Sequence, residues 1–139
     1  MQPAVTQKHG SGCAVACVAY LLKISYEKAL QLFDQPHQAW GRGFYLKEIT
    51  EALKKMDHRY SYCKLTHSKI FLLKIPGVIV FIARSQKLPL GHYLVRTKTN
   101  RWMNPWINFP CIASAKSGFQ KRLPGKAKFI IHPESSVDS

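Results

Sequence analysis

The spacing of apolar residues in this chain changes once, near residue 60, and that change restricts the folds open to it. Before it, apolar side chains recur every three to four residues, which is the spacing of a helix face. After it, short runs of β-branched and aromatic residues predominate, which is typical of strands. Helices followed by strands do not build the alternating units of a parallel sheet. We therefore predict an α+β fold in which N-terminal helices pack on an antiparallel β-sheet.

Three helices are predicted in the first half. Residues 13–22 are small or apolar on every side, so this helix is expected to be buried nearly all round. Ser25 is a suitable N-cap for a second helix over residues 26–33, which Pro36 would terminate. A third helix is predicted over residues 46–56. Its apolar stripe, expected to face the core, consists of Leu46, Ile49, Leu53 and Met56.

The second half contains five predicted strands, with a turn at Thr99 and Asn100 that makes a hairpin of the third and fourth. These strands cover residues 60–65, 78–83, 92–97, 101–103 and 128–132. Residues 66–74 are expected to form a short helix. Residues 114–126, rich in Gly, Pro and basic side chains, are expected to form a mobile surface loop.

A chain of 139 residues has room for one domain, expected over residues 1–133, with a flexible tail over residues 134–139. The four cysteines are too few for a disulfide framework, and residues 1–9 lack the apolar core of a signal peptide. We therefore expect reduced thiols in a soluble protein. No run approaches the roughly 18 apolar residues of a membrane span. The expected location is the cytoplasm, or outside the cell by a route that needs no N-terminal signal peptide.

The charge is strongly basic, with 21 Lys and Arg against 7 Asp and Glu, and no carboxylate occurs between His58 and Pro133. Such a surface attracts acidic partners, which include nucleic acid, anionic lipid and acidic peptides, or it serves only to keep the protein soluble. No RNA-binding or OB-fold motif organises the aromatic residues, so nucleic acid is not the expected partner. Roles in the core and the cleft wall are expected instead for Trp40, Trp102, Trp106, Tyr45 and Tyr93.

Cys13 is the candidate nucleophile, because it stands at the start of the first predicted helix, directly after Gly10, Ser11 and Gly12. The unpaired N–H groups and positive dipole end of a first helical turn favour a thiolate. Ser11 or Gly12 is expected to cap the helix, and the glycines permit a tight turn beside a substrate. Gln7 lies six residues before Cys13 and supplies a neutral amide that could hold an oxyanion together with the Cys13 N–H.

His92, at the start of a predicted strand, is the candidate base, because histidine alone has an ordinary pKa near neutral pH. A third group must orient its ring, and this half of the chain has no carboxylate to offer. The side-chain oxygen of Asn104, across the hairpin, is therefore the preferred acceptor, with Asn100 and Asn108 as alternatives. Trp106 is expected to shield the bond between Asn104 and His92 from water.

Together these residues resemble the papain-like superfamily in its short bacterial form, the C39-type and C39-like peptidases, over about residues 5–108. The resemblance is carried by Gln7, residues 10–13, residues 91–95 and residues 104–106. It implies a papain-like fold and a cysteine peptidase with a Cys13, His92 and Asn104 triad and oxyanion support from Gln7. C39 enzymes usually carry Gly after the cysteine and Asp before the proline, whereas this chain has Ala14 and Asn104.

The resulting hypothesis is a hydrolase that cleaves a peptide or amide bond by acyl transfer, without a cofactor, in an acidic peptide or protein. The same triad could instead serve a deamidase or transglutaminase that acts as an effector or toxin. A basic binding module without catalysis is the alternative from another class. A metal site of His9, Cys13 and Cys17, spaced four residues apart, is disfavoured because structural zinc sites usually bring two close ligand pairs, and Cys17 is assigned to the core.

Overall fold

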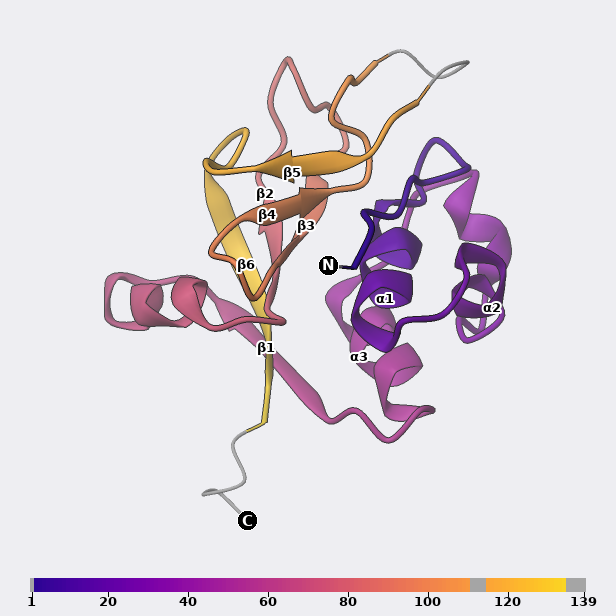
Figure 1. Ribbon diagram of the computed structural model, residues 1–139, viewed down its shortest axis with the longest axis horizontal. Coiled ribbons are helices and arrows are strands. Elements are labelled where there is room, and N and C mark those ends of the chain that lie inside the picture. Colours follow the sequence, from indigo (N-terminus) through magenta and orange to yellow (C-terminus); the bar gives the residue numbers. More distant parts are fainter. Residues whose placement is uncertain (1, 111–114, 135–139) are drawn as a thin grey trace.

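The three α-helices precede the strands in the structure, a computed structural model that describes residues 2–110 and 115–134 (Figure 1). The helices are α1 (Cys13–Leu22), α2 (Tyr26–Leu30), α3 (Leu46–Lys54) and the 3-10 helices η1 (Pro36–Ala39) and η2 (His67–Lys74). The strands are β1 (Tyr60–Lys64), β2 (Ile79–Ile82), β3 (His92–Arg96), β4 (Trp102–Asn104), β5 (Gly118–Gln120) and β6 (Ala127–Pro133). The predicted α+β architecture is confirmed.

The predicted helices are confirmed, but two of them end earlier than expected. The Ser25 hydroxyl caps α2 by accepting a bond from the Lys28 N–H, yet this helix stops at Leu30, and Pro36 begins η1 instead of terminating α2. Helix α3 stops at Lys54, because Asp57 adopts a left-handed conformation with φ of 61°. The prediction that Met56 belongs to the core is therefore wrong, since its side chain is 45% exposed.

All six strands form one antiparallel sheet in the order β1-β6-β2-β3-β4-β5. The five predicted strands are present with small shifts at their ends. The strand β5 was missed, because it lies in the segment predicted to be a mobile loop. It is only three residues long, and its stability comes from pairing with β4, in which Met103 faces Phe119.

Both faces of the sheet are covered. The helices α1, α2 and α3 lie on one face, and η2 lies on the other (Figure 1). The side chains of β2 and β3 are consequently buried on both sides, which explains why residues 78–83 are apolar without alternation. The contact of α1 with β3 brings the start of the first helix to the strand that begins with His92.

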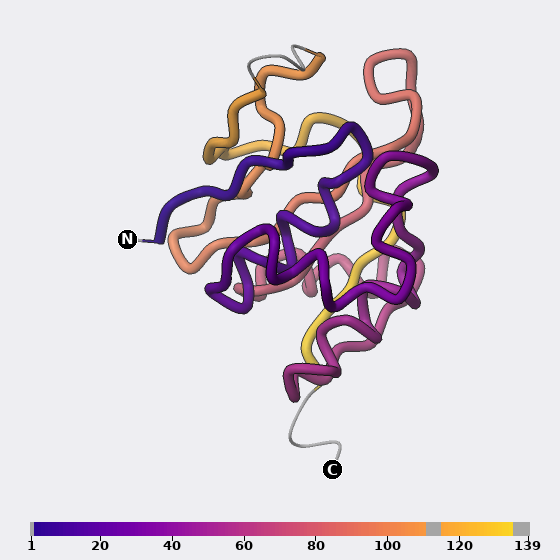
Figure 2. The backbone as a smooth tube through the Cα atoms, turned by 90° about the vertical axis from the view of Figure 1, so that its right-hand side faces the viewer, coloured from indigo at the N-terminus to yellow at the C-terminus, as the bar shows by residue number. Residues whose placement is uncertain are grey.

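The N-terminal segment runs beside the β4 and β5 end of the sheet (Figure 2). The Thr6 and Ser117 hydroxyls lie 2.7 Å apart, and the Gln7 N–H donates to the Pro105 carbonyl at 3.2 Å. These bonds fix the approach to α1 against the turn that follows β4. They hold the segment before Cys13 against the segments that follow Asn104 in the sequence.

Glu134, predicted to begin the flexible tail, is bonded to β1: its N–H donates to the Arg59 carbonyl, and its carboxylate accepts from Ser61. The remaining tail, residues 135–139, lies outside the described residues, as does Cys111. Cys13, Cys17 and Cys63 are free thiols. Within the described part of the chain, no helix is both long enough and apolar enough to cross a lipid bilayer.

Candidate active site

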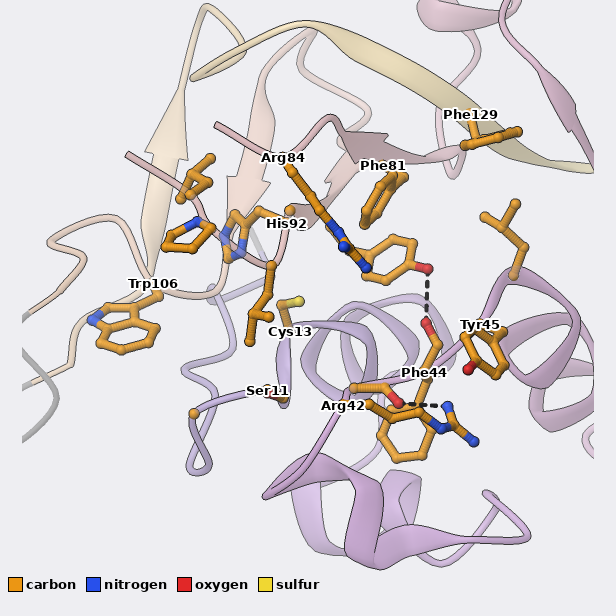
Figure 3. A pocket seen from close by; sticks show the side chains of 18 of the residues that line it. Ser11, Cys13, Arg42, Phe44, Tyr45, Phe81, Arg84, His92, Trp106 and Phe129 are labelled. Carbon is orange, nitrogen blue, oxygen red and sulfur yellow. Dashed lines mark hydrogen bonds between the residues drawn. The ribbon is translucent and has the colours of Figure 1, made fainter. Parts of the chain in front are cut away.

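A cavity of about 460 Å³ opens between the start of α1, the segment before α3, and strands β2 and β3 (Figure 3). Cys13 and His92 both line it, at the same end. Its walls are largely apolar and include Phe44, Phe81, Leu88, Leu90, Trp106, Phe109 and Phe129. The two candidate reacting groups therefore share a largely apolar cavity.

Burial raises the pKa of the Cys13 thiol to about 11, although backbone hydrogen bonds from Tyr93, Ala14 and Cys13 itself act in the opposite direction. The helix N-terminus was expected to favour the thiolate. Desolvation is the larger effect here, so the resting group is a neutral thiol. Because Tyr93 directly follows His92, its bond to the sulfur also places Cys13 against the strand that carries the imidazole.

The His92 imidazole and the Asn104 amide are hydrogen bonded, with Nε2 and Oδ1 2.7 Å apart, and each residue is only 4% exposed. The Asn104 Oδ1 also accepts a bond from the Trp106 N–H at 3.0 Å. A backbone N–H can only donate, so the shared atom is the amide oxygen and His92 Nε2 must carry the proton. This tautomer leaves the lone pair on Nδ1 as the basic site.

Burial lowers the pKa of His92, and the bond to Asn104 partly offsets this effect. The ring is therefore neutral at physiological pH and able to accept a proton. The two alternative acceptors lie elsewhere: Asn100 occupies the hairpin turn with φ of 60°, and the Asn108 Oδ1 accepts from the Lys116 N–H at 2.8 Å.

Gln120, on β5, is a polar neighbour that the sequence reasoning missed. The Asn104 Nδ2 donates to its Oε1 at 2.8 Å, and its own Nε2 donates to the Arg122 carbonyl at 2.5 Å. Nothing in the sequence around residue 120 indicated this role, because the contact depends on the pairing of β5 with β4.

Gln7 is buried beside the turn that precedes Cys13. Its Nε2 donates to the carbonyls of His9 at 2.9 Å and Gly10 at 3.3 Å, and its Oε1 is buried without a partner among the described residues. The amide therefore lies near the expected place, but its protons are directed at backbone oxygens. An oxyanion role requires that at least one of them turn towards the substrate.

Gly12 is the N-cap of α1, and a Cβ at this position would lie 2.1 Å from the Tyr26 hydroxyl. The close approach that demands glycine is thus made by Tyr26, whereas Gly10 and Ser11 line the cavity. The Ser11 hydroxyl does not cap the helix, because it donates to the Gly41 carbonyl at 2.8 Å.

Some of the aromatic residues expected in the core or the cleft wall are buried, and others are exposed. Trp106 is 6% exposed, lines the cavity and packs edge-on against Phe109 at 4.7 Å between ring centroids. Trp102 and Tyr93 are also buried, whereas Trp40 is 64% exposed and stacks on the His9 ring at 4.2 Å. Within the described ranges, no three metal-ligating side chains come together.

Three cations line the cavity, namely Arg42, Lys47 and Arg84. Arg42 is already paired with both carboxylate oxygens of Glu48, at 2.8 and 3.1 Å, and this pairing lowers the pKa of Glu48. Arg84 extends over the cavity (Figure 3). Among the described residues, no Asp or Glu lines the cavity, so its rim carries an excess of positive charge.

The overall arrangement is similar to a solved structure, the peptidase domain of Streptococcus ComA, a bi-functional ABC transporter involved in a quorum sensing pathway. The match has a TM-score of 0.55 and covers 96% of this chain and 100% of that domain, at 18% sequence identity. The chain has a papain-like α+β fold, as that peptidase domain does. The fold that the sequence resemblance implied is thereby confirmed. No protein-family model matches the sequence, and no curated protein matches it either.

Proposed function

We propose that this chain is a cysteine peptidase that cleaves a peptide bond by acyl transfer, with Cys13 as nucleophile, His92 as base and Asn104 as the residue that orients His92. The observation that carries the proposal is the hydrogen bond between His92 and Asn104, which leaves the Nδ1 lone pair available in the cavity that Cys13 also lines. The likeness to the ComA peptidase domain supports the same reading.

The chemistry begins with two neutral groups, because burial raises the pKa of Cys13 and lowers that of His92. The sulfur attacks the substrate carbonyl carbon while His92 Nδ1 takes the thiol proton, and the carbonyl oxygen becomes an oxyanion. When the C–N bond breaks, the imidazolium returns that proton to the leaving amine. Water then hydrolyses the thioester, with His92 as base again, and restores the free thiol.

Two donors are proposed for the oxyanion, the Cys13 N–H and the Gln7 Nε2. The first belongs to the opening turn of α1, where backbone N–H groups have no acceptor within the helix. The second must exchange one of its present bonds, to His9 or Gly10, for the oxyanion. The longer bond, to the Gly10 carbonyl at 3.3 Å, is the weaker of the two and therefore the one expected to be exchanged.

The proposed substrate is a peptide with a bulky apolar side chain next to an acidic one. The apolar walls suit the first, and Lys47 and Arg84 suit the second, since Arg42 is already paired with Glu48. A carboxylate beside these two cations gains a charge-assisted bond, whereas a basic side chain is repelled.

The test is cleavage of a mixed peptide library, with new termini read by mass spectrometry. Cys13→Ala should abolish both cleavage and labelling by an electrophilic peptide probe, whereas the matched control Cys63→Ala should retain both, because Cys63 lies on β1 outside the cavity. His92→Ala should slow labelling of Cys13, because the thiol then lacks its base.

Equal labelling of the Cys13→Ala variant would refute the assignment of the nucleophile. Mass shifts of about one dalton at Gln or Asn without new termini would instead identify a deamidase that uses the same groups. Binding to nucleic acid with a steep salt dependence, unchanged by Cys13→Ala, would favour the non-catalytic binding module.

A further inference from the structure

We propose that Gln120 is a positioning residue of this site, which orients the Asn104 amide so that its oxygen faces His92 and its nitrogen faces away. Gln120 lies on β5, within the segment that the sequence predicted to be a mobile loop, and its role rests on two hydrogen bonds made by its side chain. Asn104 Nδ2 donates to Gln120 Oε1 at 2.8 Å, and Gln120 Nε2 donates to the Arg122 carbonyl at 2.5 Å.

The direction of each bond follows from the fixed acceptor at the end of the chain of bonds. A backbone carbonyl can only accept, so the Gln120 atom that faces Arg122 is the NH₂ group, and the atom that faces Asn104 is the oxygen. That oxygen in turn requires a donor, which Asn104 supplies through Nδ2. The Asn104 oxygen is then left to accept from His92 Nε2.

A rotated Asn104 amide would place its NH₂ group against both the His92 Nε2 proton and the Trp106 N–H. The Trp106 N–H and Gln120 therefore act from opposite sides to select one orientation of the same amide. The arrangement also favours Asn over Asp at position 104. The carboxylate of an Asp would set a second oxygen against Gln120 Oε1, with no proton between them.

The experiment measures the protonation of the two His92 ring nitrogens by NMR, so it does not depend on catalysis. In the protein labelled with ¹⁵N, the His92 ring nitrogens should report the Nε2–H tautomer. In Gln120→Leu the Nδ1–H tautomer should become populated, and the rate of Cys13 alkylation at pH 7 should fall by about five- to tenfold, the effect of one lost net hydrogen bond. Gln120→Glu loses the bond to the Arg122 carbonyl but keeps an acceptor for Asn104 Nδ2, so it should retain the Nε2–H tautomer.

The control is Lys121→Leu, which adds the same side chain at the exposed neighbouring position, away from Asn104, and should change neither value. If Gln120→Leu does not fold, hydrogen exchange in the unmodified protein tests the bond between Asn104 and Gln120. One Asn104 Nδ2 proton should exchange with solvent at least about tenfold more slowly than a free amide, as expected for a bonded donor. Solvent-rate exchange of both protons, or an unchanged tautomer and alkylation rate in Gln120→Leu, would overturn the proposal.

The kinetic consequence of this positioning role rests on the proposed peptidase function, but the tautomer does not. A tautomer that depends on Gln120, in a protein that cleaves no peptide, would refute the function and leave the positioning role intact. Peptide cleavage that Gln120→Leu does not slow, together with an unchanged His92 tautomer, would refute the positioning role and leave the proposed function intact.

Discussion

Replacement of Gly12 by alanine tests most directly how the start of α1 is built. A Cβ on Gly12 would lie 2.1 Å from the Tyr26 hydroxyl, whereas ordinary contact begins near 3.4 Å, so the two atoms must separate by about 1.3 Å. Tyr26 is only 3% exposed and its hydroxyl is bonded to His9 Nδ1 at 3.0 Å, so the ring has no free space to enter. The strain must therefore displace the turn that leads into Cys13.

The expected cost combines overpacking, about 1–3 kcal/mol, with loss of the bond between Tyr26 and His9, about 1 kcal/mol. We expect Gly12→Ala to lower the free energy of unfolding by about 3 kcal/mol, measured by urea denaturation. Probe labelling of Cys13 should fall by about a hundredfold, since a displacement of about 1 Å at a reacting group has that effect.

A second substitution and a control isolate the contact between position 12 and Tyr26. Tyr26→Phe removes the clashing oxygen, so the double variant Gly12→Ala with Tyr26→Phe should be more stable than the sum of the single effects by at least about 1.5 kcal/mol. Gly41→Ala meets only the movable end of the half-buried Gln38 side chain, at 2.8 Å, and should cost less than about 0.5 kcal/mol. Strictly additive effects, or a Gly12→Ala variant with the stability of the original protein, would refute the clash.

The pKa of His92 is lowered in the folded state, so the neutral ring contributes stability above about pH 6.5 that is lost as the pH falls through the lowered value. The urea concentration at the midpoint of unfolding should therefore fall with decreasing pH over this range. His92→Gln should reduce that dependence on pH. Burial raises the pKa of Cys13 from about 9 to about 11, so the contribution of the neutral thiol to stability is complete below pH 9 and falls by about 2–3 kcal/mol as the pH rises towards 11. Cys13→Ala should lack this alkaline loss of stability. An equal loss in that variant would contradict the burial argument. Arg84→Glu should lower kcat/KM for acidic peptides by about tenfold and leave kcat/KM for neutral peptides unchanged. Lys121→Glu, outside the cavity, should affect both kinds of peptide equally. A larger loss for acidic peptides in Lys121→Glu than in Arg84→Glu would remove Arg84 from substrate recognition.

The sequence alone determined the features that depend on local order. The three helices, five of the six described strands and the Ser25 cap follow from spacing and turn chemistry, which act over a few residues. The absence of carboxylates between His58 and Pro133 also required an uncharged partner for His92, and Asn104 was named on that ground. Its hydrogen bond to His92 has the expected partners.

Only the tertiary structure decided the rest, because those features depend on contacts between distant residues. The strand β5 has no alternating pattern of its own and exists through β4, so Gln120 could not be foreseen as a partner of Asn104. The pKa of Cys13 depends on how much water the surrounding elements exclude, and that desolvation reversed the direction expected from the helix N-terminus. Local patterns set the elements; burial and long-range pairing set the protonation states of the residues those elements carry.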